Sequence, residues 1–252
     1  MSEAMRMWVE IVFNVLYLIV IWSLVIVMIR RFPMVAPADR TVAKLFIAAF
    51  GLLALGDTGH VGFRVLAYAQ GDLNATLTMA GTRLGLVGLG ALATAITVTL
   101  FYVLMVYIWQ ARFHKPLNWF AYLLLAAAGV RLLLMIPAAN AWNSVVPPQP
   151  WGIIRNVPLM LQGLGVAYLI LRDARASRDH AFTWIGIMIL VSYACYMPVI
   201  FFVQQAPMVG MLMIPKTLAY VAIAFIAYFD LYRKPAVVTS QQPQAVGAAG
   251  SR

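Results

Sequence analysis

The sequence predicts an all-α integral membrane protein, a polytopic bundle of seven transmembrane helices. Of its 252 residues, 63% are hydrophobic and only 10% are charged, whereas about a quarter of the residues in a soluble domain are charged. Seven apolar runs each reach the length of about 20 residues that a helix needs to cross a bilayer. Basic residues gather in alternate connections between these runs.

The seven runs follow one another along the chain. They cover residues 8–28, 42–68, 84–109, 117–136, 151–171, 181–203 and 208–232. The first run is too long for a cleavable signal peptide, and Arg30 and Arg31 stand where a cleavage site needs small residues. We expect one transmembrane domain, residues 1–234, and a disordered cytoplasmic tail, residues 235–252, which lacks an apolar face.

The placement of Lys and Arg predicts the orientation of the bundle. Basic residues follow runs one, three, five and seven: Arg30, Arg31, Arg40, Lys44, Arg112, Lys115, Arg172, Arg175, Arg178, Arg233 and Lys234. Under the positive-inside rule these segments are cytoplasmic, so the amino terminus lies outside and the carboxyl terminus inside a cell (cytoplasmic) membrane. The net charge of +10 therefore reflects topology, and we expect a lipid bilayer as partner and no nucleic acid.

Tryptophan and tyrosine support this orientation. Rings of these types concentrate at the two membrane boundaries. The outer boundary is predicted at Trp8, Tyr68, Trp142 and Trp151, and the inner boundary at Trp109, Trp119, Trp184 and Tyr232.

The second run carries a stripe of polar residues. Arg64 follows Asp57 by seven residues, nearly two helical turns, so both side chains fall on one face of a helix. His60 lies slightly to one side of that line. The stripe occupies the predicted outer half of the run.

Polar residues of the other runs lie at the same level of the predicted bundle. They are Glu10 and Asn14 in run one, Arg83 directly before run three and Thr94 within it, Arg131 in run four, Arg155 and Asn156 in run five, Tyr196 in run six and Lys216 in run seven. The cytoplasmic halves are predicted to be nearly free of such groups. A charge inside a membrane is costly and usually faces the protein interior.

The cluster has more positive than negative groups, which points to an anion. Buried charges persist when they are paired or hydrogen-bonded, and Arg binds phosphate or carboxylate through two parallel bonds. We predict a site for a small anionic ligand or lipid head group, formed by Asp57, His60, Arg64, Arg131, Arg155, Asn156, Tyr196 and Lys216. Arg83 and Arg155 alternatively extend to the outer head groups, since both lie near the ends of their runs.

Three other readings stay open. A membrane enzyme acting on a lipid-linked phosphate or acyl substrate would use His60 and Asp57 as acid and base. A rhodopsin-like protein would hold retinal as a Schiff base on Lys216, a lysine midway along the seventh run. An internal ion-pair network that only fixes helix packing would need no ligand.

Metal and haem sites find little support in the sequence. His114 and His180 lie at the cytoplasmic boundary, too far from His60 for a three-histidine zinc site or a bis-histidine haem site. Cys195 is the single cysteine. No metal is predicted, and no cofactor is assigned.

Three sequence strings resemble a group of small, uncharacterised bacterial seven-helix membrane proteins. They are Gly56-Asp57-Thr58-Gly59-His60 with Arg64 after it, the string from Trp151 to Pro158, and the string from Gly210 to Tyr220. That group has no assigned activity, so the resemblance implies the fold and no function. It implies that Asp57, His60, Arg64, Arg155, Asn156 and Lys216 belong to one recurring arrangement.

Overall fold

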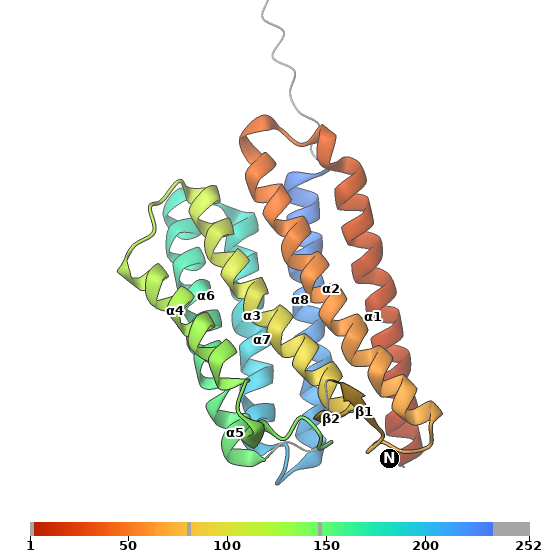
Figure 1. The fold of residues 1–252 in the computed structure, drawn as a ribbon. Coiled ribbons are helices and arrows are strands. Elements are labelled where there is room, and N and C mark those ends of the chain that lie inside the picture. Colours follow the sequence, from red (N-terminus) through yellow and green to blue (C-terminus); the bar gives the residue numbers. More distant parts are fainter. Residues whose placement is uncertain (1–2, 80–81, 146–147, 234–252) are drawn as a thin grey trace, which may run out of the picture.

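Long helices run up and down alongside one another in the computed structural model of the chain (Figure 1). The structure describes residues 3–79, 82–145 and 148–233, and the predicted tail, residues 235–252, lies outside the described residues. The α-helices are α1 (Glu3–Arg31), α2 (Arg40–Ala69), α3 (Leu86–Phe113), α4 (Trp119–Leu134), α5 (Gln149–Ile154), α6 (Val157–Ser177), α7 (His180–Phe202) and α8 (Met213–Leu231). Short 3₁₀ helices are η1 (Phe32–Met34), η2 (Pro37–Asp39), η3 (Ala138–Asn140) and η4 (Pro207–Leu212).

The predicted all-α membrane bundle is confirmed in its general form. Within the described residues, six helical segments are long and apolar enough to cross a membrane, and α4 is a shorter apolar helix of 16 residues. Such helices suit a multi-pass protein in a lipid bilayer. The seventh crossing and the orientation stay predictions.

The two ends of the bundle are built differently. The start of α1, the strands β1 (Thr76–Met79) and β2 (Thr82–Gly85), and α5 lie at one end, which we call the hairpin end (Figure 1). The connections from α1 to α2 and from α3 to α4 lie toward the other, which we call the opposite end.

A short β-hairpin, which the sequence analysis did not predict, lies between the second and third predicted runs. β1 and β2 pair antiparallel, with Thr76 opposite Gly85, and α3 begins at Leu86 instead of residue 84. Thr76, Leu77 and Thr78 alternate β-branched and apolar side chains, a pattern that favours a strand. Gly85 then donates its N–H to the carbonyl of Trp142 at 3.2 Å, which ties the hairpin to the connection after α4.

The predicted fifth run is divided into two helices. α5 ends at Ile154 and α6 begins at Val157, so Arg155 and Asn156 lie at a break. Pro158 explains the break, because it has no N–H for the carbonyl of Ile154 and its ring crowds that carbonyl. The break brings two polar residues and their backbone to the interior of the bundle.

Helices α2 and α3 approach closely along a seam of glycines. A Cβ atom on Gly90 would lie 2.8 Å from the Cα atom of His60, and one on Gly59 would lie 3.3 Å from the Cβ atom of Ala93. Small residues permit such close packing in membranes. Gly51 and Gly62, by contrast, have no atom within 4 Å of an added Cβ.

A charged cluster connects the helices at the opposite end, mostly through residues that flank the predicted apolar runs. Arg112 of α3 donates to Asp179 at 2.8 Å, to Asp39 at 3.1 Å and to Asp230 at 3.1 Å. These carboxylates precede α7, precede α2 and lie in α8, respectively. One guanidinium thus connects four helices.

Two of the aromatic residues predicted at the inner membrane boundary are buried instead. Trp109 is 1% exposed and donates its indole N–H to Asp173 at 2.8 Å. Tyr232 is 2% exposed and donates to the carbonyl of Ala43 at 2.6 Å. Each ring has a polar partner inside the protein and so faces the helices instead of the lipid. Trp119 and Trp184 are exposed, as the prediction requires.

Candidate functional site

One cavity collects all the residues predicted to form the site. Its volume is about 410 Å³, within the usual range of small-molecule pockets. It lies in the half of the bundle near the hairpin end, between the start of α1, α2 and α3 on one side and α6, α7 and the start of α8 on the other. The predicted residues that line it are Asp57, His60, Arg64, Arg131, Arg155, Asn156, Tyr196 and Lys216. Their part in ligand binding stays a prediction.

Arg131, on the last turn of α4, is held by neutral partners. Its side chain is only 2% exposed. The guanidinium donates to the hydroxyl of Thr99 at 2.7 Å and to the carbonyls of Ala95 and Arg155, both at 3.2 Å. It also donates to the amide oxygen of Asn156 at 3.2 Å. No carboxylate of the described residues forms an ion pair with it.

The break between α5 and α6 positions Arg155 and Asn156. The guanidinium of Arg155 stacks over the ring of Trp142, 4.4 Å from its centre, and donates to the amide oxygen of Asn140 at 3.4 Å. The side chain of Asn156 donates to the carbonyl of Gly152 at 2.7 Å. Its oxygen accepts from Arg131 and, at 3.3 Å, from the hydroxyl of Tyr196. Both residues therefore stay in the cavity wall.

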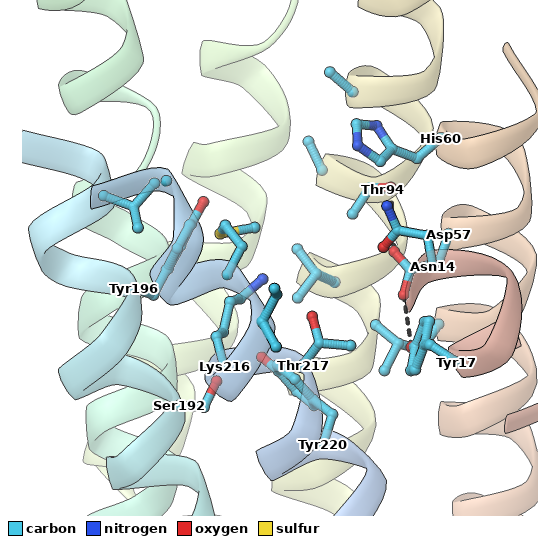
Figure 2. Close-up of a pocket in the computed structure, with 18 of the residues that line it drawn as sticks. Asn14, Tyr17, Asp57, His60, Thr94, Ser192, Tyr196, Lys216, Thr217 and Tyr220 are labelled. Carbon is cyan, nitrogen blue, oxygen red and sulfur yellow. Dashed lines mark hydrogen bonds between the residues drawn. The ribbon is translucent and has the colours of Figure 1, made fainter. Parts of the chain in front are cut away.

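Lys216 enters the cavity from the beginning of α8. Its amino nitrogen lies 4.5 Å from the centre of the Tyr196 ring and 5.6 Å from that of Tyr220. Figure 2 shows the side chain between Tyr196 on one side and Thr94 and Asp57 on the other. Aromatic faces attract a cation, but they leave its positive charge uncompensated.

Asp57 is the carboxylate of the cavity, and two hydroxyls hold it. Tyr17 of α1 donates to it at 2.7 Å, and Thr94 of α3 at 3.4 Å (Figure 2). Asp57 and Lys216 interact electrostatically, but they form no ion pair in the described part of the chain. The carboxylate is thus bound mainly by neutral donors.

His60 and Arg64 line the cavity next to Asp57 on α2, as their spacing predicts. The Nδ1 atom of His60 is buried and has no hydrogen-bond partner among the described residues. The oxygens of Asp57 accept from Tyr17 and Thr94. An Asp57–His60 hydrogen bond is therefore absent from the described residues, which weakens the case for an acid–base pair.

Sequence reasoning missed Tyr17, the strongest partner of Asp57. Tyr17 follows Asn14 by three residues, and both line the cavity, so helical spacing could have found it. Arg83, which was predicted either to line the site or to extend outward, is exposed on β2 and is not among the lining residues. The side chain of Glu10 lies outside the described residues.

The charges of the lining do not balance. Among the described side chains, the cations Arg131, Arg155 and Lys216 line the cavity together with the single carboxylate of Asp57. Among the described residues, no three His, Cys, Asp or Glu side chains lie together as metal ligands would. The described lining therefore carries more positive than negative side chains.

Comparison of the chain with protein-family models, with curated proteins and with solved structures finds no match.

Proposed function

We propose that the protein binds a small anion, or the anionic head group of a lipid, in this cavity and acts in the membrane as a transporter or sensor. The supporting observation is a group of three cations whose described hydrogen bonds and ring contacts are all with neutral groups. Arg131, Arg155 and Lys216 line one cavity, where carbonyls, a hydroxyl, amide oxygens and aromatic rings contact them.

An anion would supply what these side chains lack. A cation removed from water costs several kcal/mol unless an opposite charge or good hydrogen bonds compensate it. Arg offers planar, bidentate recognition of carboxylate and phosphate, and Lys offers a point charge. A ligand with one such group would neutralise the excess positive charge of the cavity.

The broken helix beside the site favours transport. Helices that stop and restart next to a central cavity are typical of transporters, where the free backbone groups help to bind the substrate. The break at Arg155 and Asn156 has this position. A sensor would need a partner protein, because the connections between the helices are short.

The test is saturable anion binding by the full chain in lipid nanodiscs, measured by titration calorimetry with acetate and with inorganic phosphate as probes. We expect Lys216→Met and Arg131→Met to abolish binding while the protein stays monodisperse. Arg83→Met is the matched control, since this Arg is exposed and lies outside the cavity. Unchanged affinity in both cavity variants would refute the proposal.

A further inference from the structure

One side of the cavity is lined by a group of apolar residues, and further apolar residues of α2, α3 and α6 line it elsewhere. This side is formed by the start of α1, the end of α7 and the segment from η4 into α8, and it carries Val9, Phe13, Val199, Val203, Met211 and Met213. The cations Arg131 and Arg155 lie on other parts of the wall, and Lys216 follows Met213 on α8. The cavity therefore offers a ligand an apolar surface as well as a positive one.

The entrance of the cavity is also apolar. Among the described side chains of the lining, Val9 and Met213 are the most exposed, at 40% and 37%. Val9 lies near the start of α1 and Met213 at the start of α8, and these helices contact each other. Exposure at these residues indicates that the cavity opens between the two helix starts.

The polarity changes along both helices from the entrance inward. On α1 the lining residues run from Val9 and Phe13 to Asn14 and Tyr17. On α8 they run from Met213 to Lys216, three residues further along the helix and about 4.5 Å deeper. A ligand entering here meets hydrocarbon first and charge afterwards.

The entrance lies near the expected membrane boundary. Val9 is two residues from the apolar segment that begins at Ile11, and its neighbour Trp8 is 61% exposed. Exposed Trp is typical of the boundary between head groups and hydrocarbon. An apolar entrance at this level is accessible to molecules that partition into the bilayer, and it disfavours strongly hydrated ions.

We propose that the ligand of this cavity is an amphipathic anion, with one anionic group on a hydrocarbon chain. Its anionic group would contact Arg131 and Lys216, and its chain would lie against Phe13, Val203 and Met213. This inference rests on the proposed function, because it names the chemical class of the anion. Met side chains suit such a role, since they adapt to chains of different shape.

The test compares acetate with hexanoate, titrated into the full chain in phosphatidylcholine nanodiscs, with empty nanodiscs to subtract partitioning. Each buried methylene contributes about fourfold in affinity. We expect wild-type protein to bind hexanoate roughly tenfold to a hundredfold more tightly than acetate, since only part of the chain is buried.

Substitutions on the apolar side of the cavity test whether this side causes the higher affinity for hexanoate. Phe13→Asn and Met213→Gln should reduce the preference for hexanoate and leave acetate affinity unchanged. Val12→Asn and Leu218→Gln are matched controls on the same helices, because both residues are 52% exposed and neither lines the cavity. Both controls should keep the wild-type preference.

The outcomes separate the two proposals. Saturable acetate binding without a preference for hexanoate, or a preference that Phe13→Asn and Met213→Gln both leave intact, would overturn the amphipathic ligand and leave anion binding standing. No saturable binding of acetate, phosphate or hexanoate would overturn the proposed function together with this inference.

Discussion

Asp57 has a charge opposite to that of the groups proposed to bind the ligand. Its carboxylate lies in the cavity wall, held by Tyr17 and Thr94. The same carboxylate would repel an incoming anion, while it also attracts Lys216. The sign of its effect on anion affinity therefore shows whether repulsion of the anion or attraction of Lys216 dominates.

Asp57→Asn should strengthen anion binding. The amide keeps the shape and can still accept a hydrogen bond from Tyr17, but it removes the negative charge. Removing a negative charge that lies several ångströms from the bound anion raises the affinity for acetate by roughly threefold to tenfold. Titration calorimetry in nanodiscs measures the change, and Asp72→Asn is the control because Asp72 is exposed and does not line the cavity. A weaker affinity would mean that Asp57 acts by positioning Lys216.

At the scale of the elements, the site depends on the close backbone approach of α2 and α3. Gly90 faces the Cα atom of His60, and Gly59, on the same seam, faces Ala93. Asp57 and His60 belong to α2, while Thr94 belongs to α3. Any separation of the two helices therefore moves one wall of the cavity relative to another.

Gly90→Ala should destabilise the protein and weaken anion binding. The added Cβ would lie 2.8 Å from His60, against backbone that cannot turn aside. Overpacking of this kind costs about 1–3 kcal/mol, which corresponds to a melting temperature lower by about 3–10 °C. Gly62→Ala is the control, because an added Cβ there meets nothing within 4 Å. Equal melting temperatures for the two variants would contradict the importance of the seam.

Most of the helices could be predicted from the sequence, because a long apolar run in a membrane protein generally forms a helix. The predictions that were wrong concern features with only short or local sequence signals. Strands of four residues leave little periodicity to recognise, and the hairpin was missed. The break before α6 had a visible cause in Pro158, but the continuous apolar run concealed it.

The candidate site was predicted better than the cluster at the opposite end. Asp57, His60 and Arg64 share one helix face, so spacing alone brings them together. The partners of Arg112 are 67, 73 and 118 residues away from it in the chain. No local pattern reveals contacts of that kind, and Arg112 was assigned to a cytoplasmic connection.

At the scale of the whole molecule, Arg112 joins the start of α2, the start of α7 and the end of α8. Arg112→Gln would remove the cation that bridges these three carboxylates. We expect a loss of about 2–3 kcal/mol, because the groups are only partly buried, measured as a lower melting temperature in detergent. Arg172→Gln should cost less than about 1 kcal/mol, since Arg172 is 42% exposed and its partner Asp173 is its neighbour in the chain. Equal losses would show that the cluster does not hold the helices together.

The number of crossings depends on α4. Its 16 residues extend over about 24 Å, whereas the hydrocarbon core is about 30 Å thick. Apolar side chains continue past its end, with Leu133 66% and Ile136 75% exposed, which suits a helix whose apolar surface extends beyond its last turn. If α4 crosses the membrane, the basic connections all fall on one side, as the positive-inside rule requires. If α4 does not cross, the connection after α6 moves to the other side, and its three arginines violate the rule.

Single cysteines distinguish the two topologies in a Cys195→Ser background. We expect a membrane-impermeant maleimide to label Asn74→Cys and Asn143→Cys in intact cells, and to label Lys115→Cys and Ser177→Cys only after lysis. All four native residues are exposed, so each position is accessible to the reagent. Asn143→Cys and Lys115→Cys flank α4 directly, and the same labelling pattern at both would show that α4 does not span. Labelling of Ser177→Cys in intact cells would place α6, α7 and α8 in the reverse orientation and leave the amino and carboxyl termini on the same side of the membrane.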